Sequence, residues 1–248
     1  MSLVTTDWVL ENLNSLKIID ASWHMPAQKR NPAEEYLNAH IPNSVFFDLD
    51  KNSEKDTDLP HMLPKQEAWG KIMSSLGINN NDDILIYDNS DLKSSCRCWF
   101  SLLYFGHDEK KIHILNGGLK KWIFENKPIT KGTTEIIESN YVANKKENLV
   151  VNLDQIKNNI LSKSFNVIDA RSLERFEGKV SEPRKGLKSG HIQNSFCLPF
   201  NLCINQKTGE FKNLEEIKEL FNQRENIDKR LDPVFTCGSG VTAAVLAY

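Results

Sequence analysis

The chain contains the segment Ile18-Ile19-Asp20-Ala21-Ser22, which returns later as Val167-Ile168-Asp169-Ala170-Arg171. Two further segments recur in the same order: residues 40–44 return at 191–195, and residues 83–88 correspond to 232–237. The offsets between matching positions are 149, 151 and 149 residues. Three matches in one order and nearly one register indicate that the chain is a tandem duplication.

The same alternation of elements is predicted in both halves. Short apolar runs bounded by turn residues are typical of buried strands, and they lie at residues 17–21, 45–47, 84–87, 111–115, 166–170 and 233–236. Helical periods with start and stop signals lie at residues 8–13, 65–76, 96–105, 118–126, 154–161 and 214–223. Strands that alternate with helices favour an α/β fold, so we expect two domains, each a mainly parallel sheet with helices on both faces.

The second half is shorter than the first. After Asp88 the first half continues through a strand, two glycines and a helix, whereas only eleven residues follow Cys237. We expect a first domain over residues 1–138, a polar linker over 139–147, and a second domain over 148–248 that lacks its last strand and helix, about 30 residues by ordinary α/β unit size. Such a second domain should leave apolar surface uncovered near its last helix.

The composition excludes several classes of function. With 31 basic and 33 acidic side chains the net charge is −2, so the chain offers no general field for nucleic acid or anionic lipid. No apolar run approaches the length that crosses a bilayer. The first 13 residues include Asp7 and Glu11 and lack the pattern of a signal peptide, so we expect a cytoplasmic protein without a nucleic-acid or membrane partner.

Five cysteines are scattered along the chain, and an odd number without a secretory signal argues against a disulfide framework. Four of them are expected to be small buried apolar side chains: Cys96, Cys98, Cys197 and Cys203. Cys96 and Cys98 form the only close pair in the sequence. Because no second pair accompanies them, we expect neither a metal site nor a cofactor.

Cys237 differs from the others because it begins a glycine-containing loop, Cys237-Gly238-Ser239-Gly240-Val241-Thr242, between an expected strand and an Ala-rich helix start. The glycines allow several main-chain amides to point inward, and the helix adds the positive end of its dipole. Such a setting stabilises a thiolate, which is the nucleophilic form. The corresponding residues 88–95 contain neither cysteine nor glycine, so only the second half can carry this chemistry. The alternative is a buried structural cysteine beside a turn.

A cysteine-dependent phosphatase also places its nucleophile in a loop between a strand and a helix, so it is a rival interpretation. Such an enzyme needs an arginine six positions after the cysteine to hold the phosphate dianion. This chain has Ala243 at that position, which excludes the usual form of that enzyme.

The chain resembles the tandem rhodanese family over essentially all of its length. The resemblance rests on four segments in family order: His40-Ile41-Pro42, Asn116-Gly117-Gly118-Leu119, Gly190-His191-Ile192 and the Cys237 loop, which is similar to that of 3-mercaptopyruvate sulfurtransferases. Gln193 departs from the family's proline, and Asn43 and Asn194 depart from its glycine, in a turn that is structural. The resemblance implies an inactive first rhodanese-like domain packed against an active second one.

The uncharged residues of the loop favour one kind of sulfur donor. Thiosulfate-using relatives carry basic residues directly after the cysteine, where this chain has Gly238 and Ser239. A monoanionic mercapto-acid with its charge at the far end therefore fits better than a dianion. The resemblance implies that Arg175 and Arg184 hold the carboxylate of the donor, to which arginine offers a bidentate grip. It implies that the other substrate contacts come from the loop, through Gly238, Gly240, Val241 and Thr242.

The resemblance also implies a relay in which Ser239, His61 and Asp50 deliver a proton. Removing sulfur from mercaptopyruvate leaves the enolate of pyruvate, which must be protonated. Asp50 and His61 belong to the first half, so the site is expected between the domains. The remaining histidines are expected to be structural: His24, His40, His107, His113 and His191.

These residues together predict a sulfurtransferase. It would move sulfur from 3-mercaptopyruvate, through a persulfide on Cys237, to cyanide or a thiol such as thioredoxin, and release pyruvate. Two alternatives stay open: a thiosulfate:cyanide sulfurtransferase, and a non-catalytic sulfur carrier or regulatory rhodanese module. The presence of Cys237, Ser239 and both arginines weighs against the non-catalytic module, and an assay of pyruvate release separates it from the enzyme.

Overall fold

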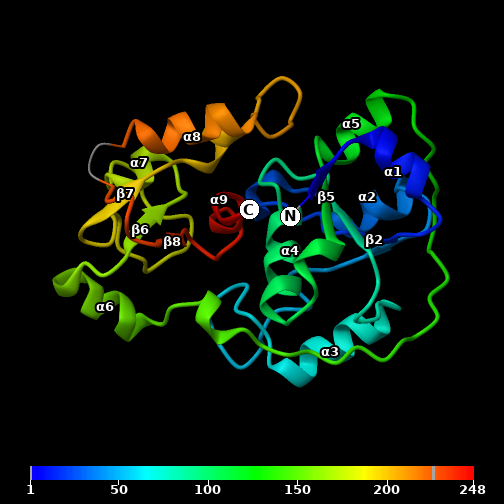
Figure 1. The fold of residues 1–248 in the computed structure, drawn as a ribbon, viewed down its shortest axis with the longest axis horizontal. Helices are drawn as coiled ribbons and strands as arrows, with labels where there is room; N and C mark the ends of the chain where they lie inside the picture. The colour runs from blue at the N-terminus through cyan, green and yellow to red at the C-terminus, as the bar shows by residue number, and fades with distance from the viewer. Residues whose placement is uncertain (1, 225–226) are drawn as a thin grey trace.

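The computed structural model describes residues 2–224 and 227–248 and places two α/β units next to each other (Figure 1). The first unit contains a five-stranded sheet in the order β1-β5-β4-β2-β3, and the second a three-stranded sheet in the order β7-β6-β8. The strands are β1 Ser2–Val4, β2 Lys17–Asp20, β3 Ser44–Phe46, β4 Ile84–Tyr87, β5 Ile112–Leu115, β6 Asn166–Asp169, β7 Ser195–Cys197 and β8 Pro233–Thr236. All described pairs are parallel and none joins the two sheets, so the predicted pair of parallel sheets is confirmed.

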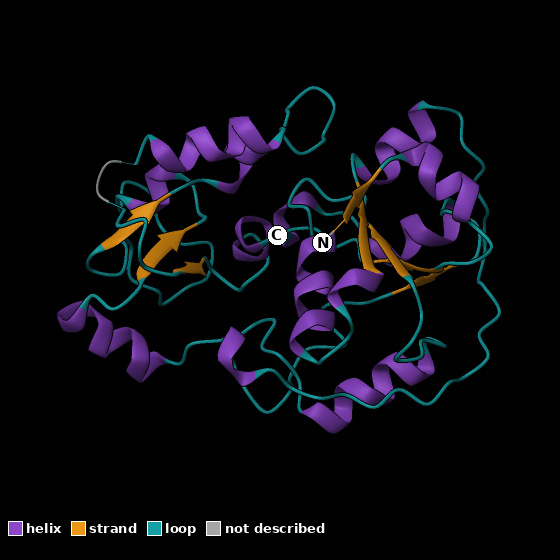
Figure 2. Ribbon diagram, viewed as in Figure 1, coloured by secondary structure: helices purple, strands orange, loops and turns teal. Residues whose placement is uncertain are grey.

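Helices cover both faces of the first sheet (Figure 2). The helices of the two units are α1 Thr6–Asn12, α2 Pro32–Asn38, α3 Gln66–Ser75, α4 Ser95–Tyr104, α5 Gly118–Phe124, α6 Leu153–Ser162, α7 Leu173–Phe176, α8 Leu214–Asn222 and α9 Ala243–Ala247. Successive residues of β2 point to opposite faces, as strand geometry requires. Ile18 belongs to the apolar cluster that contains Trp122 of α5. Ile19 belongs to the cluster of the other face, with Trp69 of α3 and Trp99 of α4.

The two sheets repeat the same pairing. In the first, Asp20 at the end of β2 lies opposite Tyr87 of β4, and β3 pairs with the other side of β2. In the second, Asp169 at the end of β6 lies opposite Thr236 of β8, and β7 pairs with the other side of β6. Both members of the central pair are displaced by 149 residues, which is the offset of the sequence repeat. The duplication therefore extends from sequence to strand register.

Two histidines at one repeat position make the same contacts. His40 Nδ1 lies 2.8 Å from the carbonyl oxygen of Tyr36, and His191 Nδ1 lies 2.8 Å from the carbonyl oxygen of Phe176. Each imidazole also stacks on the aromatic ring of that residue, with ring centroids 4.2 and 3.8 Å apart. These matching contacts agree with the prediction that His40 and His191 are structural.

The sheets differ at one edge. β4 is flanked by β2 and β5, and all four of its residues are buried. Its counterpart β8 is flanked by β6 alone within the described residues, and none of its four residues is buried. β8 is therefore an edge strand within the described residues, whereas β4 is internal. The apolar surface expected near the last helix is not observed, because Ala243, Ala244, Val245 and Leu246 of α9 are buried.

The two units share one apolar cluster. Ala244 and Val245 of α9 lie in the same cluster as Trp99 of α4, and Tyr248 meets the Trp99 ring edge-on with centroids 5.0 Å apart. Figure 1 shows α9 between the second sheet and the first unit, beside α4. The second unit has a smaller cluster of its own around Ile168. This packing fixes the start of α9, and with it the preceding loop, against the first unit.

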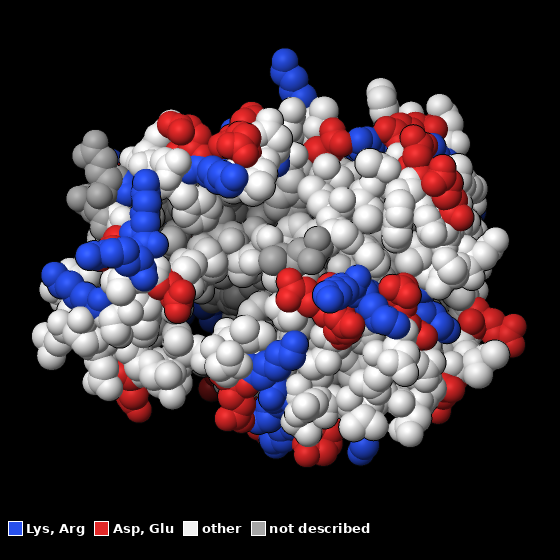
Figure 3. Space-filling view, viewed as in Figure 1, with Lys and Arg blue, Asp and Glu red and all other residues white. Residues whose placement is uncertain are grey.

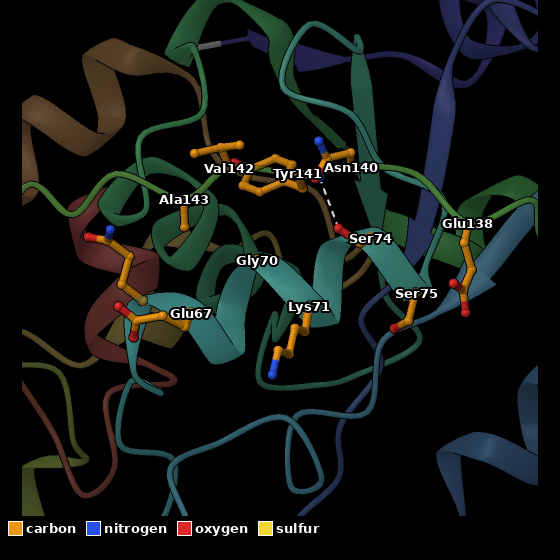
Figure 4. A pocket seen from close by; sticks show the side chains of 11 residues that line it. Glu67, Gly70, Lys71, Ser74, Ser75, Glu138, Asn140, Tyr141, Val142 and Ala143 are labelled. Atoms are coloured by element: carbon orange, nitrogen blue, oxygen red, sulfur yellow. Dashed lines mark hydrogen bonds between the residues drawn. The ribbon is translucent and has the colours of Figure 1, made fainter.

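The segment that joins the units packs on the first one. Tyr141 is buried, and its main-chain N donates a hydrogen bond to Ser74 Oγ of α3 at 2.9 Å (Figure 4). A Cβ on Gly106 would lie 2.6 Å from the carbonyl oxygen of Asn144, so only glycine fits at this close approach. The predicted polar linker over 139–147 is therefore docked on α3 and the end of α4, and the domain boundaries on either side of it stay a prediction.

All five cysteines are unpaired. Cys96, Cys98 and Cys203 are buried, as predicted, and desolvation raises the pKa of all three thiols. Cys197 is half-buried, which corrects its predicted burial, because β7 lies at an edge of the second sheet. Desolvation, and then the charge of Asp169, raise the pKa of Cys197 to about 11, so this thiol is protonated at neutral pH.

Candidate active site

Cys237 follows β8 and begins the loop that leads into α9. The thiol is half-buried, and its Sγ accepts a hydrogen bond from the main-chain N of Gly240 at 3.1 Å. Gly240 has a φ of 82°, and a Cβ there would lie 2.8 Å from Nη1 of Arg97, so only glycine fits. Val241 is buried in the shared cluster, and Thr242 lies directly before α9 without a side-chain capping bond. The loop therefore holds the sulfur beside a main-chain donor.

A hydrogen-bonded chain joins this loop to the first unit. Ser239 Oγ lies 3.0 Å from His61 Nδ1, and His61 Nε2 lies 2.8 Å from Asp50 Oδ1. The three residues of the expected relay therefore lie in order, each within hydrogen-bonding distance of the next. The hydrogen bond from His61 is the main reason that the pKa of Asp50 lies below its ordinary value. An ionised Asp50 favours a proton on Nε2, which leaves Nδ1 to exchange a proton with Ser239.

Trp23 supports this chain, although the sequence analysis did not identify it. Its Nε1 donates a hydrogen bond to Asp50 Oδ2 at 3.0 Å, and its ring meets the His61 ring edge-on with centroids 4.7 Å apart. Trp23 is buried and follows β2 closely. Both contacts join residues that are far apart in sequence, so no local pattern singles out this tryptophan.

The two predicted carboxylate-binding arginines border the loop at Gly238. Arg184 Nη2 donates to the carbonyl oxygen of Gly238 at 2.7 Å, and Arg175 Nη2 lies 3.3 Å from the position that a Cβ on Gly238 would occupy. Arg175 also donates through Nε and Nη2 to Glu182, at 3.2 and 2.5 Å. The hydrogen bond from Arg175 is the main reason that the pKa of Glu182 is lowered. Glu182, which the sequence analysis missed, therefore orients one of the two arginines.

Arg97 lies behind the loop and was also missed. It is on α4 of the first unit, and its Nη2 donates to the carbonyl oxygen of His61 at 2.6 Å. In the sequence it stands between Cys96 and Cys98, which attract attention as a pair of thiols rather than through the residue between them. Only the packing of the two units brings Arg97 to the back of the Cys237 loop.

The corresponding loop of the first unit is closed on itself. Asp88 stands at the repeat position of Cys237 and is 4% exposed. Its Oδ1 accepts a hydrogen bond from Ser90 N at 3.0 Å, and its Oδ2 accepts one from Ser95 N at 2.8 Å. Asp88 has no sulfur atom that could carry a persulfide. Both of its carboxylate oxygens accept hydrogen bonds from main-chain amides of its own loop, so those amides are not free to bind a substrate. This geometry agrees with the expectation that the first half is catalytically inactive.

Two pockets lie away from these residues. One of about 490 Å³ lies between α3 and the docked segment at residues 138–143 (Figure 4). The other, of about 750 Å³, lies between α5 and residues 200–210. None of the predicted site residues lines either pocket, so neither is part of the candidate site.

The surface and the described side chains give no sign of other ligand classes. Acidic and basic side chains are interspersed on the face that Figure 3 shows, and neither sign covers it. No cluster of three or more histidine, cysteine or acidic side chains is placed to hold a metal ion in residues 2–224 and 227–248. Over the same residues, no helix combines the length and the apolar character needed to span a membrane.

Comparison with known proteins places this geometry in a family. Residues 5–125 match the family model of the rhodanese-like domain. The chain is 39% identical to the mitochondrial thiosulfate/3-mercaptopyruvate sulfurtransferase 1 of Arabidopsis thaliana, over 99% of this chain and 70% of that protein. It is 37% identical to the 3-mercaptopyruvate sulfurtransferase of Escherichia coli strain K12, over 98% of this chain and 86% of that protein. The crystal structure of the E. coli protein SseA, a 3-mercaptopyruvate sulfotransferase, superposes with a TM-score of 0.90 at 34% identity, and the match covers 100% of this chain and 92% of that one.

Proposed function

The chain belongs to the rhodanese family of sulfurtransferases, and on that premise we propose that it transfers the sulfur atom of 3-mercaptopyruvate to a thiol or cyanide acceptor through Cys237. One observation carries the choice of donor: the chain of hydrogen bonds from Ser239 through His61 to Asp50. Loss of sulfur from a mercapto-acid leaves a carbanion that must be protonated, whereas loss of sulfur from thiosulfate leaves sulfite, which needs no such proton. A proton relay next to the sulfur carrier is therefore useful for the mercapto-acid.

The donor would bind by its carboxylate. Arg184 and Arg175 both border the loop at Gly238, and guanidinium groups suit the planar carboxylate of an α-keto acid. The loop itself presents main-chain groups and the hydroxyl of Ser239 rather than a cation. A donor with one negative charge, held at its far end, fits this distribution better than a small dianion, which needs cationic side chains from the loop residues that follow the cysteine.

The reaction would proceed in two transfers. The Cys237 thiolate attacks the sulfur of the donor, the carbon–sulfur bond breaks, and its electron pair leaves as the enolate of pyruvate. Ser239 gives a proton to the enolate carbon and recovers one from protonated His61, whose positive charge the ionised Asp50 stabilises. The persulfide forms as an anion, and the proton that the donor thiol releases returns to His61, so the relay is restored. The outer sulfur of the persulfide on Cys237 then passes to an attacking thiolate or to cyanide, which restores the Cys237 thiolate.

A steady-state assay of pyruvate release tests this proposal. With 3-mercaptopyruvate and a reduced thiol such as thioredoxin, the chain should release pyruvate continuously, and thiosulfate should be a much poorer donor. The double variant Gly238→Arg with Ser239→Lys places two cations beside the sulfur and removes the relay hydroxyl, so it should shift the preference toward thiosulfate. A wild-type chain that already prefers thiosulfate would show that the donor is wrongly assigned.

Two alternatives give other results in the same assay. The Arabidopsis relative carries both thiosulfate and 3-mercaptopyruvate in its name, so thiosulfate stays the second candidate donor. A non-catalytic carrier would accept one sulfur atom on Cys237 and release one equivalent of pyruvate without turnover. Thioredoxin as the acceptor and a cytoplasmic location both stay predictions.

A further inference from the structure

Arg97 is a buried cation without a carboxylate partner. Its side chain lies inside the shared core beside α9, and the whole residue is 8% exposed. Its Nη2 donates to the carbonyl oxygen of His61, but its Nε has no hydrogen-bond partner, and no acidic side chain in the described part of the chain forms an ion pair with it. A desolvated charge of this kind is unfavourable unless an opposite charge lies nearby.

The nearest candidate for that charge is the sulfur anion on Cys237. Nη1 of Arg97 lies 2.8 Å from the position that a Cβ on Gly240 would take, and Gly240 N is the group that donates to Cys237 Sγ. Burial lowers the pKa of Arg97 to about 10, and the attraction of the Cys237 thiolate opposes this lowering. Arg97 is therefore charged at neutral pH, and it lies directly behind the loop that carries the sulfur.

Arg97 also acts on the relay. His61 has a φ of 58°, in the left-handed region that is unfavourable for any residue other than glycine, and its carbonyl oxygen points to Arg97 Nη2 at 2.6 Å. The main chain at His61 is thus held from behind while its imidazole points to Ser239. Loss of this hydrogen bond removes a constraint on the direction of the ring.

We propose that Arg97 is a positioning residue of the sulfur-transfer site, which fixes His61 through its main chain and supplies the buried positive charge that balances the anion on Cys237. The thiolate and the persulfide each carry one negative charge, so the same cation serves both states of the carrier. The proposal rests on the proposed function where it takes Cys237 as the sulfur carrier. The electrostatic part of the proposal concerns only the charge on the Cys237 sulfur, so it applies whatever reaction this site carries out.

Other charges also face the loop, and they differ from Arg97 in their surroundings. Arg175 and Arg184 approach from the second unit, and His61 with Asp50 approaches through Ser239. Glu182 and the carbonyl oxygen of Gly238 already accept hydrogen bonds from the two arginines of the second unit. Arg97 lies on the protein side of the loop, where water screens its charge least.

The pH dependence of Cys237 alkylation tests the electrostatic part. The full chain is treated with iodoacetamide over a range of pH, and mass spectrometry of the Cys237 peptide separates this thiol from the other four cysteines. In Arg97→Met the midpoint should rise by about one to three pH units, because the nearby opposite charge is lost. The matched control is Arg30→Met, which removes a cation paired with Glu35 in the same unit and should leave the midpoint unchanged.

Arg97→Lys separates the charge from the geometry. Lysine keeps the positive charge, so the alkylation midpoint of Cys237 should stay within about half a pH unit of wild type. Lysine lacks the planar guanidinium group that reaches both His61 and Gly240, so kcat for pyruvate release should fall about ten- to a hundredfold. If Arg97→Met does not fold in a thermal melt, Arg97→Gln, which keeps a donor but no charge, carries the same expectation for the midpoint.

The outcomes distinguish the inference from the proposed function. An unchanged midpoint in the folded uncharged variant would overturn the electrostatic part, and an unchanged kcat in Arg97→Lys would overturn the positioning part. A raised midpoint in a chain whose wild type releases no pyruvate would refute the proposed function and leave the electrostatic part of the inference standing.

Discussion

The loop after β4 and the loop after β8 leave the same position in two sheets of one design, yet they stabilise different anions. In the first unit the anion is the Asp88 carboxylate, bound by the main-chain amides of Ser90 and Ser95. In the second it is the thiolate that Cys237 forms in the proposed reaction, and this sulfur accepts one amide hydrogen bond and is half-buried. Both loops direct amides at a negative group that follows a strand. The two sheets therefore provide similar surroundings for a negative group that follows the strand. The side chain at that position, Asp88 or Cys237, determines whether the group is structural or reactive.

The first unit, which has Asp88 at the repeat position of Cys237, nevertheless contributes to the candidate site. His61 and Arg97 come from it and lie against the loop of the other unit. Asp50 and Trp23 also come from it and contact the His61 ring. Under the proposed function the duplication separates two tasks: the second unit carries the sulfur, and the first supplies the groups that position it and exchange protons at the site. Each prediction below changes one side of this division.

The largest effect is expected at the two residues that share one repeat position, Cys237 and Asp88. Cys237→Ser should abolish pyruvate release, because a hydroxyl cannot carry a persulfide. Asp88→Asn, the matched change in the first unit, should leave sulfur transfer in place and lower thermal stability, because two buried amides lose a charged acceptor. Steady-state kinetics and a thermal melt of both variants measure this contrast. Equal loss of activity in the two would contradict the separation of tasks.

The next effect concerns the proton that the first unit supplies. His61→Ala should lower kcat by about 10²- to 10⁴-fold, the usual range for a lost general acid. KM should change little, since the proton is needed only as the carbon–sulfur bond breaks. Asp50→Asn should give a smaller loss. Because the pKa of Asp50 is depressed, its support for a protonated His61 is present at neutral pH and is lost only as pH falls through that low value. Activity of His61→Ala equal to wild type would show that the proton comes from elsewhere.

A smaller effect is expected from the donor-binding arginines of the second unit. Arg184→Gln should raise KM for 3-mercaptopyruvate by about ten- to a hundredfold, which corresponds to one lost charge-assisted contact of about 1.5–3 kcal/mol. kcat should stay close to wild type if substrate and transition state are held alike. Arg230→Gln is the control, because this exposed arginine pairs with Asp228 on the surface. A fall in kcat at constant KM would instead place Arg184 in the chemical step.

The smallest effect compares two equivalent aspartates through stability. Asp20 is buried and bound to the main-chain N of Ser22, and desolvation raises its pKa to about 6, whereas Asp169 forms an ion pair with Arg171. A raised pKa means that the folded state holds its proton longer than the unfolded state. The free energy of unfolding should therefore fall as the pH rises from about 4 to about 6, by on the order of 3 kcal/mol. Urea titrations over this range should show the fall in wild type and a flatter profile in Asp20→Asn. A profile of the same slope in both would assign the fall to other groups.

Much of the fold is predictable because the pattern of each central strand occurs twice in the sequence, once in each half. The central strands β2, β4, β6 and β8 follow from apolar runs at matching positions, and the observed bounds differ from the predicted ones by at most one residue. The missed elements are short: β1 Ser2–Val4, α2 Pro32–Asn38, α7 Leu173–Phe176 and β7 Ser195–Cys197. β1 exists only through its pairing with β5, more than a hundred residues away. Asn31 caps α2 and Pro32 opens it, a start signal that the sequence analysis did not use.

The residues of the candidate site also fall into those that the sequence indicates and those that it does not. The Cys237 loop is visible in the sequence because its residues are consecutive, and the relay followed from resemblance to a family rather than from spacing. Arg97, Trp23 and Glu182 have no such signal, because each acquires its contact through tertiary packing. Single residues that meet only through tertiary packing cannot be found from periodicity or turn chemistry.

The apolar cluster that α4 and α9 share makes the second unit depend on the first for burial of its last helix. Trp99, Ala244 and Val245 bury one another, so a second unit produced alone would present the apolar side of α9 to water. It would also lose every group that the first unit places around Cys237. Removal of the first unit would therefore expose an apolar helix face and take away the hydrogen-bonded chain through His61 at the same time.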